Sequence, residues 1–240
     1  MAINTIPEYK MLTDRSLRQR RRELAVQQRM LHGIERRVVP LIRRVIEEDV
    51  ARAAEAFAAD GEGVLPFAMR GHQANIERVL VTVWKSSADR FGQRIFAASQ
   101  KAWWGLEFKY AGDTFRRRVD DWIATYGGEK IVNITNTTMK QVRSAIQQGE
   151  SQGFNVNETA KLIVEQTGGT IAKARSRVIA RTEVHNAAVA AGDFAAESLN
   201  EDLDLELVRE WISAEDLRRR PSHARADGQR RDMQTPFDVG

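Results

Sequence analysis

The sequence contains no cysteine, so it can form neither a disulfide framework nor a thiolate metal site. No apolar run approaches the roughly 18 residues that a membrane-spanning helix needs. Residues 1–10 also lack the basic and apolar stretches of a signal segment. These absences predict a soluble chain that is not exported by a cleaved signal and has no membrane partner.

Signatures of enzymes are scarce as well. The glycine pairs Gly127–Gly128 and Gly168–Gly169 stand alone, without the lysine of a phosphate-binding loop. A thiol nucleophile is excluded because there is no cysteine. We therefore predict a protein that is not an enzyme, with no catalytic residue, no cofactor and no bound metal.

Charge is unevenly distributed, although the formal net charge of +4 is too small to indicate DNA binding by itself. Residues 197–216 are strongly acidic, with Arg209 as their single basic residue, and residues 218–231 are rich in arginine, with Asp227 as their single acid. Adjacent blocks of opposite sign suit protein partners or polyanions, depending on which block is exposed.

The N-terminal part has the pattern of a long amphipathic helix that ends at Asp60–Gly61, with Pro40 expected to kink it. Apolar residues recur every seven positions from Leu17 to Val45, and Ile34 and Leu41 join this seam. A row of arginines has the same period and lies about 200° from the seam; it consists of Arg15, Arg22, Arg29, Arg36 and Arg43. This row is either a solvated face or a contact with DNA or an acidic partner.

Glycine and proline divide the next part of the chain. We expect a loop over residues 61–71 and a helix over about 73–101. An aromatic cluster follows, whose density favours a core or a subunit contact over base stacking. It consists of Trp103, Trp104, Phe108, Tyr110, Phe115 and Trp122.

A boundary is predicted at Tyr126–Gly128. After it we expect a helix over about 135–148, a second helix from an Asn157 cap to Gly168–Gly169, and an alanine-rich helix over about 171–199. Alternation of apolar and polar residues from Leu205 to Ser213 then predicts a strand.

The predicted fold is therefore mainly α. Long N-terminal helices form a region of residues 1–126 that contacts partners. Residues 127–240 form a compact α+β domain, in which the alanine-rich helix packs under a small sheet containing Trp211.

Charged residues inside the alanine-rich helix are the first candidates for a site. Arg181, Thr182 and Glu183 indicate a partly buried network, because a buried ion needs a partner. We expect Arg181 and Glu183 to pair with Asp216, Arg218 or Arg220. The alternative is a metal-dependent nuclease or other effector, using Glu183, His185, His223 and Asp227. Asp227–Gly228 is more simply a turn.

The C-terminal part resembles the phage Mu F-like minor head proteins, also called the phage head morphogenesis family. The resemblance covers about residues 135–240 and depends on three stretches, residues 137–166, 174–192 and 210–229. The family pattern is an I-A-R-T-E helix ending in small residues and a glycine, then a tryptophan strand, D-x-R-x-R-x-x-H and D-G-Q. The matching residues here are Arg181, Thr182, Glu183, Ala187, Gly192, Trp211, Asp216, Arg218, Arg220, His223, Asp227, Gly228 and Gln229. Family members commonly continue past the stretch at Pro236–Val239 into a cysteine motif, which this sequence lacks.

The resemblance implies a structural protein of a tailed phage, present in few copies inside the capsid near the portal vertex, and in the host cytoplasm during assembly. The portal protein is the implied partner, and the major capsid protein, the scaffolding protein and packaged DNA are further candidates. Head assembly, DNA packaging and DNA ejection are the implied roles. A non-specific DNA-binding module that uses the arginine row is a further alternative.

Overall fold

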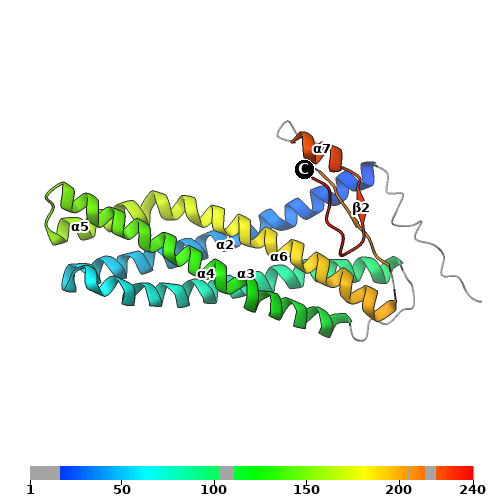
Figure 1. Ribbon diagram of the computed structural model, residues 1–240, viewed down its shortest axis with the longest axis horizontal. Helices are drawn as coiled ribbons and strands as arrows, with labels where there is room; N and C mark the ends of the chain where they lie inside the picture. The colour runs from blue at the N-terminus through cyan, green and yellow to red at the C-terminus, as the bar shows by residue number, and fades with distance from the viewer. Residues whose placement is uncertain (1–16, 103–110, 205, 214–219, 240) are drawn as a thin grey trace, which may run out of the picture.

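The structure is a computed structural model that describes residues 17–102, 111–204, 206–213 and 220–239. Four long helices form an elongated bundle (Figure 1): α2 (Leu17–Asp60), α3 (Leu65–Ala102), α4 (Ala111–Ser151) and α6 (Ala172–Leu203). The shorter elements are the 3₁₀ turn η1 (Glu62–Val64), helix α5 (Val156–Ile163), the π-helix η2 (Val164–Ile171), strand β1 (Arg209–Glu210), helix α7 (Pro221–Ala226) and strand β2 (Arg230–Arg231). The prediction of a mainly α fold with a small C-terminal sheet is confirmed.

Helices α3 and α6 pack against each other at the centre of the bundle, and each also contacts α2 and α4. Alanines of α6, such as Ala180, Ala187 and Ala191, are fully buried and allow this close approach. Residues from all four long helices belong to a single hydrophobic core. The N-terminal and C-terminal parts of the sequence are therefore packed together by shared apolar burial.

The expected helix break at Tyr126–Gly128 is wrong, because α4 continues through these residues without interruption. Gly127 lies against the indole of Trp84, and a Cβ built on it would come within 2.5 Å of Trp84 Cζ3. The glycine is thus needed for close packing and not for a turn. The division predicted between residues 126 and 127 falls inside this helix.

The apolar seam of α2 also differs from the predicted heptads. Leu41 is 47% exposed, whereas the buried positions follow mostly four-residue steps: Ile34, Val38, Ile42, Ile46, Val50, Ala53 and Phe57. A step of four residues rotates the buried stripe by about 40° around the helix. The stripe turns in this way because α2 packs on α3 and α6 and also on α5 and η2.

The predicted loop over residues 61–71 is much shorter, because α3 already begins at Leu65. Pro66 lies in the first turn of α3, where a proline removes no helical hydrogen bond. As a result, Met69 and His72 occupy core positions that continue through Ile76 and Leu80.

The connection from α4 to α6 has a different cap from the one predicted. Asn155, not Asn157, caps α5, and it forms a capping box with Glu158. The break predicted at Gly168–Gly169 is confirmed, since Gly169 has non-helical angles of φ −88° and ψ −107° inside the π-helix η2.

The C-terminal segment, meaning the described residues from 206 to 239, lies at one end of the bundle (Figure 1). Strands β1 and β2 pair antiparallel, with Arg209 opposite Arg231, and are shorter than the strand predicted over 205–213. The backbone N–H of Leu207 donates to Asn200 of α6, and Arg209 lies 3.7 Å from Asp193. Leu205 lies outside the described residues. Across the described residues, none of the helices has the length and hydropathy needed to cross a bilayer.

The two adjacent glycines of α4 provide a matched test of the packing at Trp84. Gly127→Ala should lower the free energy of unfolding by about 1–3 kcal/mol, because the added methyl overlaps the indole. Gly128 has open space around it, so Gly128→Ala should raise stability by about 0.5–1 kcal/mol through helix propensity. Urea denaturation measures both. Similar effects at the two positions would contradict the close approach of Gly127 to Trp84.

Candidate functional site

Glu183 is enclosed between α3, α4 and α6. Its side chain is 3% exposed and accepts a hydrogen bond of 3.0 Å from the indole N–H of Trp84. The hydroxyl of Tyr126 also bonds to Glu183 and receives a bond from Asn186. The ring of Tyr126 stacks on Trp122, and both rings meet Trp84 edge-on. We call Trp84, Trp122, Tyr126, Glu183 and Asn186 the aromatic–carboxyl cluster.

Burial controls the titration of this cluster. Loss of hydration raises the pKa of Glu183, against the opposing hydrogen bonds from Trp84 and Tyr126 and the attraction of Lys130. Burial, together with the neighbouring Glu183 carboxylate, raises the pKa of Tyr126 to about 12. The hydroxyl of Tyr126 therefore stays a hydrogen-bond donor at neutral pH.

Of the partners expected for Arg181 and Glu183, only Arg220 lies among the described residues, and Glu183 bonds to α3 and α4 rather than to Arg220. Arg181 and Thr182 are exposed on α6. Among the described residues, neither Arg181 nor Arg220 makes an ion pair or hydrogen bond through its side chain. Asp216 and Arg218 lie outside the described residues. Successive helix positions differ by about 100°, so Glu183 can face inward while Arg181 faces solvent.

A second polar cluster links all four long helices. His72 Nδ1 of α3 lies 2.8 Å from Asp49 Oδ2 of α2, and His72 Nε2 lies 3.1 Å from Thr138 Oγ1 of α4. Arg175 of α6 donates to the same Thr138 oxygen at 2.9 Å and to the carbonyl of Ile134. We call Asp49, His72, Thr138 and Arg175 the four-helix network.

The carboxylate of Asp49 is held by several donors. Burial alone would raise the pKa of Asp49, but hydrogen bonds from His72, Arg52 and Asn75 outweigh it and lower that pKa. Burial also lowers the pKa of Arg175, which donates to Gln141 as well as to Thr138.

The order Asp49–His72–Thr138 resembles a carboxylate, a base and a hydroxyl nucleophile. The surroundings argue against that chemistry. Asp49, His72 and Thr138 are all buried, and the Thr138 hydroxyl also lies 3.1 Å from the carbonyl of Ile134. A substrate has no path to this oxygen, so the network stabilises the packing of the helices.

Sequence reasoning missed the four-helix network because the predicted loop over residues 61–71 removed His72 from the helical pattern. With α3 begun at Leu65, His72 lies in register with Leu65, Met69 and Ile76, which marks it as a core histidine. Asp49 lies between the buried Ile46 and Val50 of α2, and this position likewise indicated a buried side chain.

A serine pattern was also overlooked. Residues 149–153 match G-x-S-x-G, the pattern of a nucleophile elbow, which requires a strand-to-helix turn. Here Ser151 is the exposed last residue of α4, and its hydroxyl donates to the carbonyl of Gln148. Gly149 packs against Thr159, and Gly153 has the positive φ of 72° that ends the helix. The pattern therefore serves the turn between α4 and α5.

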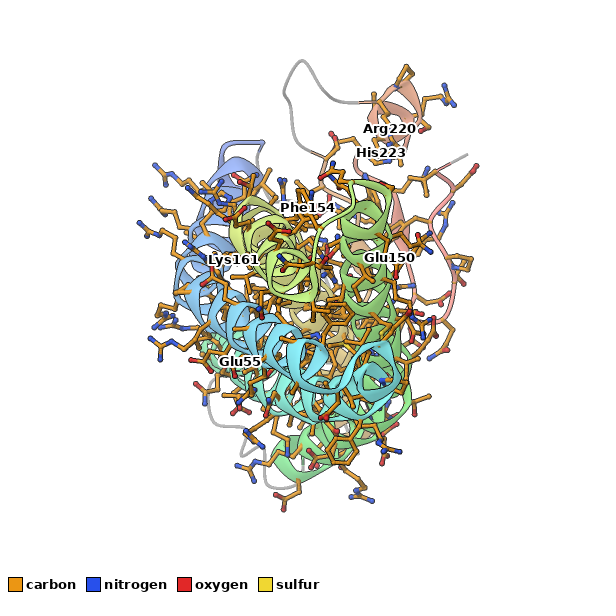
Figure 2. All side chains as sticks on the ribbon, turned by 90° about the vertical axis from the view of Figure 1, so that its left-hand side faces the viewer. Glu55, Glu150, Phe154, Lys161, Arg220 and His223 are labelled. Atoms are coloured by element: carbon orange, nitrogen blue, oxygen red, sulfur yellow. The ribbon has the colours of Figure 1, made fainter. Side chains whose placement is uncertain are left out.

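The C-terminal segment brings together several residues of the predicted motif. The ring centroid of Trp211 lies 5.6 Å from that of His223 and 5.4 Å from that of Phe237. The backbone N–H of Ser213 donates to Asp227, and that of Gly228 donates to the carbonyl of Trp211. Gly228 has a φ of 81°, so Asp227–Gly228 is the predicted turn. Figure 2 shows Arg220, the residue that precedes α7, and His223 on α7, set apart from the helices of the bundle.

The four residues of the alternative effector site have different surroundings. Glu183 contacts aromatic rings in the bundle, His185 is exposed on α6, and His223 packs on Trp211. Within the described ranges, no group of three or more His, Asp or Glu side chains is placed to bind a metal ion. The structure does not bring all four of these residues together.

The arginine row lies on the exposed side of α2, with Arg22, Arg29, Arg36 and Arg43 all exposed. Arg43 pairs with Glu47 at 2.7 Å. Arg15 lies outside the described residues, as do Trp103, Trp104, Phe108 and Tyr110 of the predicted aromatic cluster. Its other members, Phe115 and Trp122, pack in the bundle.

A family model described as Phage Mu protein F like protein matches residues 140–239. Over these residues the chain is similar to that family. The resemblance seen in the sequence is thereby confirmed, and it associates the chain with phage head morphogenesis and with the virion. Searches of curated proteins and of solved structures gave no significant match.

The matched residues, which we call the Mu F like region, comprise the end of α4, α5, η2, α6 and the C-terminal segment. They include Glu183, Asn186 and Arg175, but the partners Trp84, Tyr126 and Thr138 precede residue 140. Some hydrogen-bond partners of these three residues therefore lie in the chain that precedes the Mu F like region.

Substitution of Glu183 tests the aromatic–carboxyl cluster. Glu183→Ala should cost roughly 3 kcal/mol of unfolding free energy, because it leaves the Trp84 N–H and the Tyr126 hydroxyl without their acceptor. The exposed control Arg181→Gln should stay within about 0.5 kcal/mol. Equal losses for these two variants would contradict the cluster.

The pH dependence follows from the raised pKa of Glu183. The folded protein holds this proton more tightly than the unfolded chain, so stability falls as pH rises from the unfolded value of 4.5 through the raised pKa. Glu183→Gln keeps an acceptor oxygen without the charge and should lack this fall. Thermal unfolding of the wild type and of Glu183→Gln, measured from acidic to neutral pH, tests this difference. Identical dependence of stability on pH in the two proteins would contradict the raised pKa of Glu183.

The four-helix network is tested at Asp49. Asp49→Asn replaces an acceptor by an amide that meets three donors, and should lower stability by about 3 kcal/mol at neutral pH. Because the pKa of Asp49 is lowered, its contribution is present above the unfolded value of 3.8 and is lost as pH falls through the folded pKa. The exposed Asp89→Asn is the matched control and should change stability by less than about 0.5 kcal/mol. Urea denaturation gives the free energy of unfolding of both variants, and equal changes at the two positions would contradict the four-helix network.

Proposed function

We propose that the chain is a structural minor head protein of a tailed phage, associated with the portal inside the capsid and acting in head assembly, DNA packaging or DNA ejection. The observation that carries this proposal is the match of residues 140–239 to the Mu F like family. The match covers the C-terminal segment and α6, one of the two helices at the centre of the bundle.

The chemistry of the buried polar groups supports a structural role. Glu183 and Asp49 are carboxylates of the kind that enzymes use, yet each is hydrogen-bonded to core side chains of neighbouring helices. The candidate nucleophile Thr138 is fully buried. Polar groups whose hydrogen bonds are made inside the core fix the packing of the helices and are not available to bind a substrate.

The experiment is quantitative mass spectrometry of purified heads, with and without DNA and with and without the portal protein. We expect a few copies of the chain per particle in both filled and empty heads, and none in particles that lack the portal. Loss with the portal is expected because the portal would be the only anchor.

Two results would contradict the proposal. A chain missing from all particles would not be a head protein. A chain retained in full amount in particles without portal would be anchored elsewhere, on the major capsid or scaffolding protein. Deletion of the scaffolding gene in the same experiment distinguishes anchoring on the major capsid protein from anchoring on the scaffolding protein.

A further inference from the structure

The outer face of α6 changes charge along its length. Residues 172–192 contain four basic residues, and their single acid, Glu183, is buried. The following residues, 193–206, contain six acids and no basic residue. The acidic end is covered in part, because Arg118 pairs with Glu197 and Glu201, and Arg209 lies 3.7 Å from Asp193. The basic stretch carries the exposed positive charge of this helix.

Three cations of this stretch are exposed and without a carboxylate partner in the described part of the chain. They are Lys173, Arg177 and Arg181, spaced four residues or about 6 Å apart along the helix. Several cations on α3 and α4, in contrast, are paired with carboxylates of neighbouring helices, as Arg94 is with Glu23 and Lys85 with Asp120. The electrostatic potential of α6 is therefore not cancelled locally.

The flank of α6 that carries these cations faces α2. Arg175 and Asn186 reach α4 from the other flank, and Arg177, two residues after Arg175, is rotated by about 200° from it. Lys173 and Arg181, four residues to either side, stay near Arg177. This places the three cations along the line where α6 packs on α2.

The arginine row of α2 borders the same line. Glu23 and Met30 face α3, where both contact Arg94. Arg36 lies six residues after Met30, about 120° around the helix and away from this contact, and Arg29 and Arg43 keep its direction within about 20°. In Figure 2, α2 and the beginning of α6 lie side by side on one face of the bundle. The two helices run in opposite directions (Figure 1), and Gly168 of η2, shortly before α6, lies against Val50 of α2.

We propose that α2 and α6 form one surface that binds the phosphate backbone of duplex DNA, through Arg29 and Arg36 on α2 and Lys173, Arg177 and Arg181 on α6. Duplex DNA carries a negative charge about every 1.7 Å along its axis, so two rows of unpaired cations can displace its counterions. Neither residues 24–46 of α2 nor residues 172–192 of α6 contain an aromatic residue, although aromatic anchors are enriched in protein interfaces. The composition favours DNA over an acidic protein. Because the contacts are to phosphates, the binding is independent of sequence.

The test uses the purified full-length chain and a short fluorescently labelled duplex, with anisotropy measured at several salt concentrations between about 50 and 200 mM. Three variants are compared with the wild type. One neutralises α6 (Lys173→Gln, Arg177→Gln, Arg181→Gln), one neutralises α2 (Arg29→Gln, Arg36→Gln), and the matched control neutralises exposed cations of α3 and α4 (Arg90→Gln, Arg117→Gln, Lys140→Gln). The thermal unfolding of each variant is measured first, because exposed substitutions should leave it near that of the wild type.

We expect the α6 variant to raise Kd about tenfold and to reduce the slope of log K against log salt by about 2 to 3, and the α2 variant to reduce the slope by about 2. The control, with the same charge change as the α6 variant, should keep the wild-type slope. Equal losses in the control and the α6 variant would overturn the proposal, since attraction would then depend on net charge alone. Wild type that does not bind duplex DNA would overturn it as well.

Incorporation into heads distinguishes this proposal from the proposed function. If the α6 variant loses DNA binding but still enters heads with the portal, both proposals stand. If the wild type does not bind DNA and the α6 variant fails to enter heads, the surface binds an acidic protein, and the DNA proposal is wrong while the structural role stands. Duplex binding without any incorporation into heads overturns the structural role alone.

Discussion

The arrangement of the bundle depends on polar side chains that are enclosed between its helices. A buried carboxylate, imidazole or guanidinium is costly unless its hydrogen bonds are made, and the donors and acceptors sit on different helices. Glu183 needs Trp84 and Tyr126, and His72 needs Asp49 and Thr138. Sliding one helix by a turn would keep most apolar contacts but would leave these groups unsatisfied. Apolar burial therefore holds the helices together, and the two polar clusters select their register.

The glycines and small residues of the bundle also follow from the way its helices pack. Gly127 admits the indole of Trp84, and the small residues of α6 allow α3 to approach. Gly169, with its non-helical backbone angles, lies in the π-helix that precedes α6. The glycine pairs, which look alike in the sequence, have different roles: one permits a close approach inside a helix, and the other bends the chain between helices.

Much of the helical pattern was predictable from the sequence. The end of the first helix at Asp60, the break at Gly168–Gly169 and the alanine-rich helix all follow from local residue types, which act over a few positions. Predictions failed where a distant contact decides the outcome. Gly127 continues a helix because of Trp84, 43 residues earlier in the sequence, and the partner of Glu183 is 99 residues away. The family motif identified Glu183 and Trp211 as notable residues but gave no indication of what they contact.

The site residues divide in the same way. The burial of His72 was not predicted because the predicted loop extended too far. Once the start of α3 is known, its spacing from Leu65, Met69 and Ile76 marks it as a core residue. The charged faces were easier to recognise, because exposure follows from helical periodicity alone. That Arg181 belongs to such a face, while Glu183 belongs to the core, could be established only from the packing of α6.

The bonds of Glu183 and Arg175 to residues that precede the Mu F like region have a consequence for how this protein can change over evolutionary time. A substitution at position 84 or 138 alters what positions 183 and 175 can tolerate, so the two parts of the gene cannot drift independently. Exchange of residues 1–139 between related proteins would preserve the packing only when the complementary residues on α6 are exchanged as well.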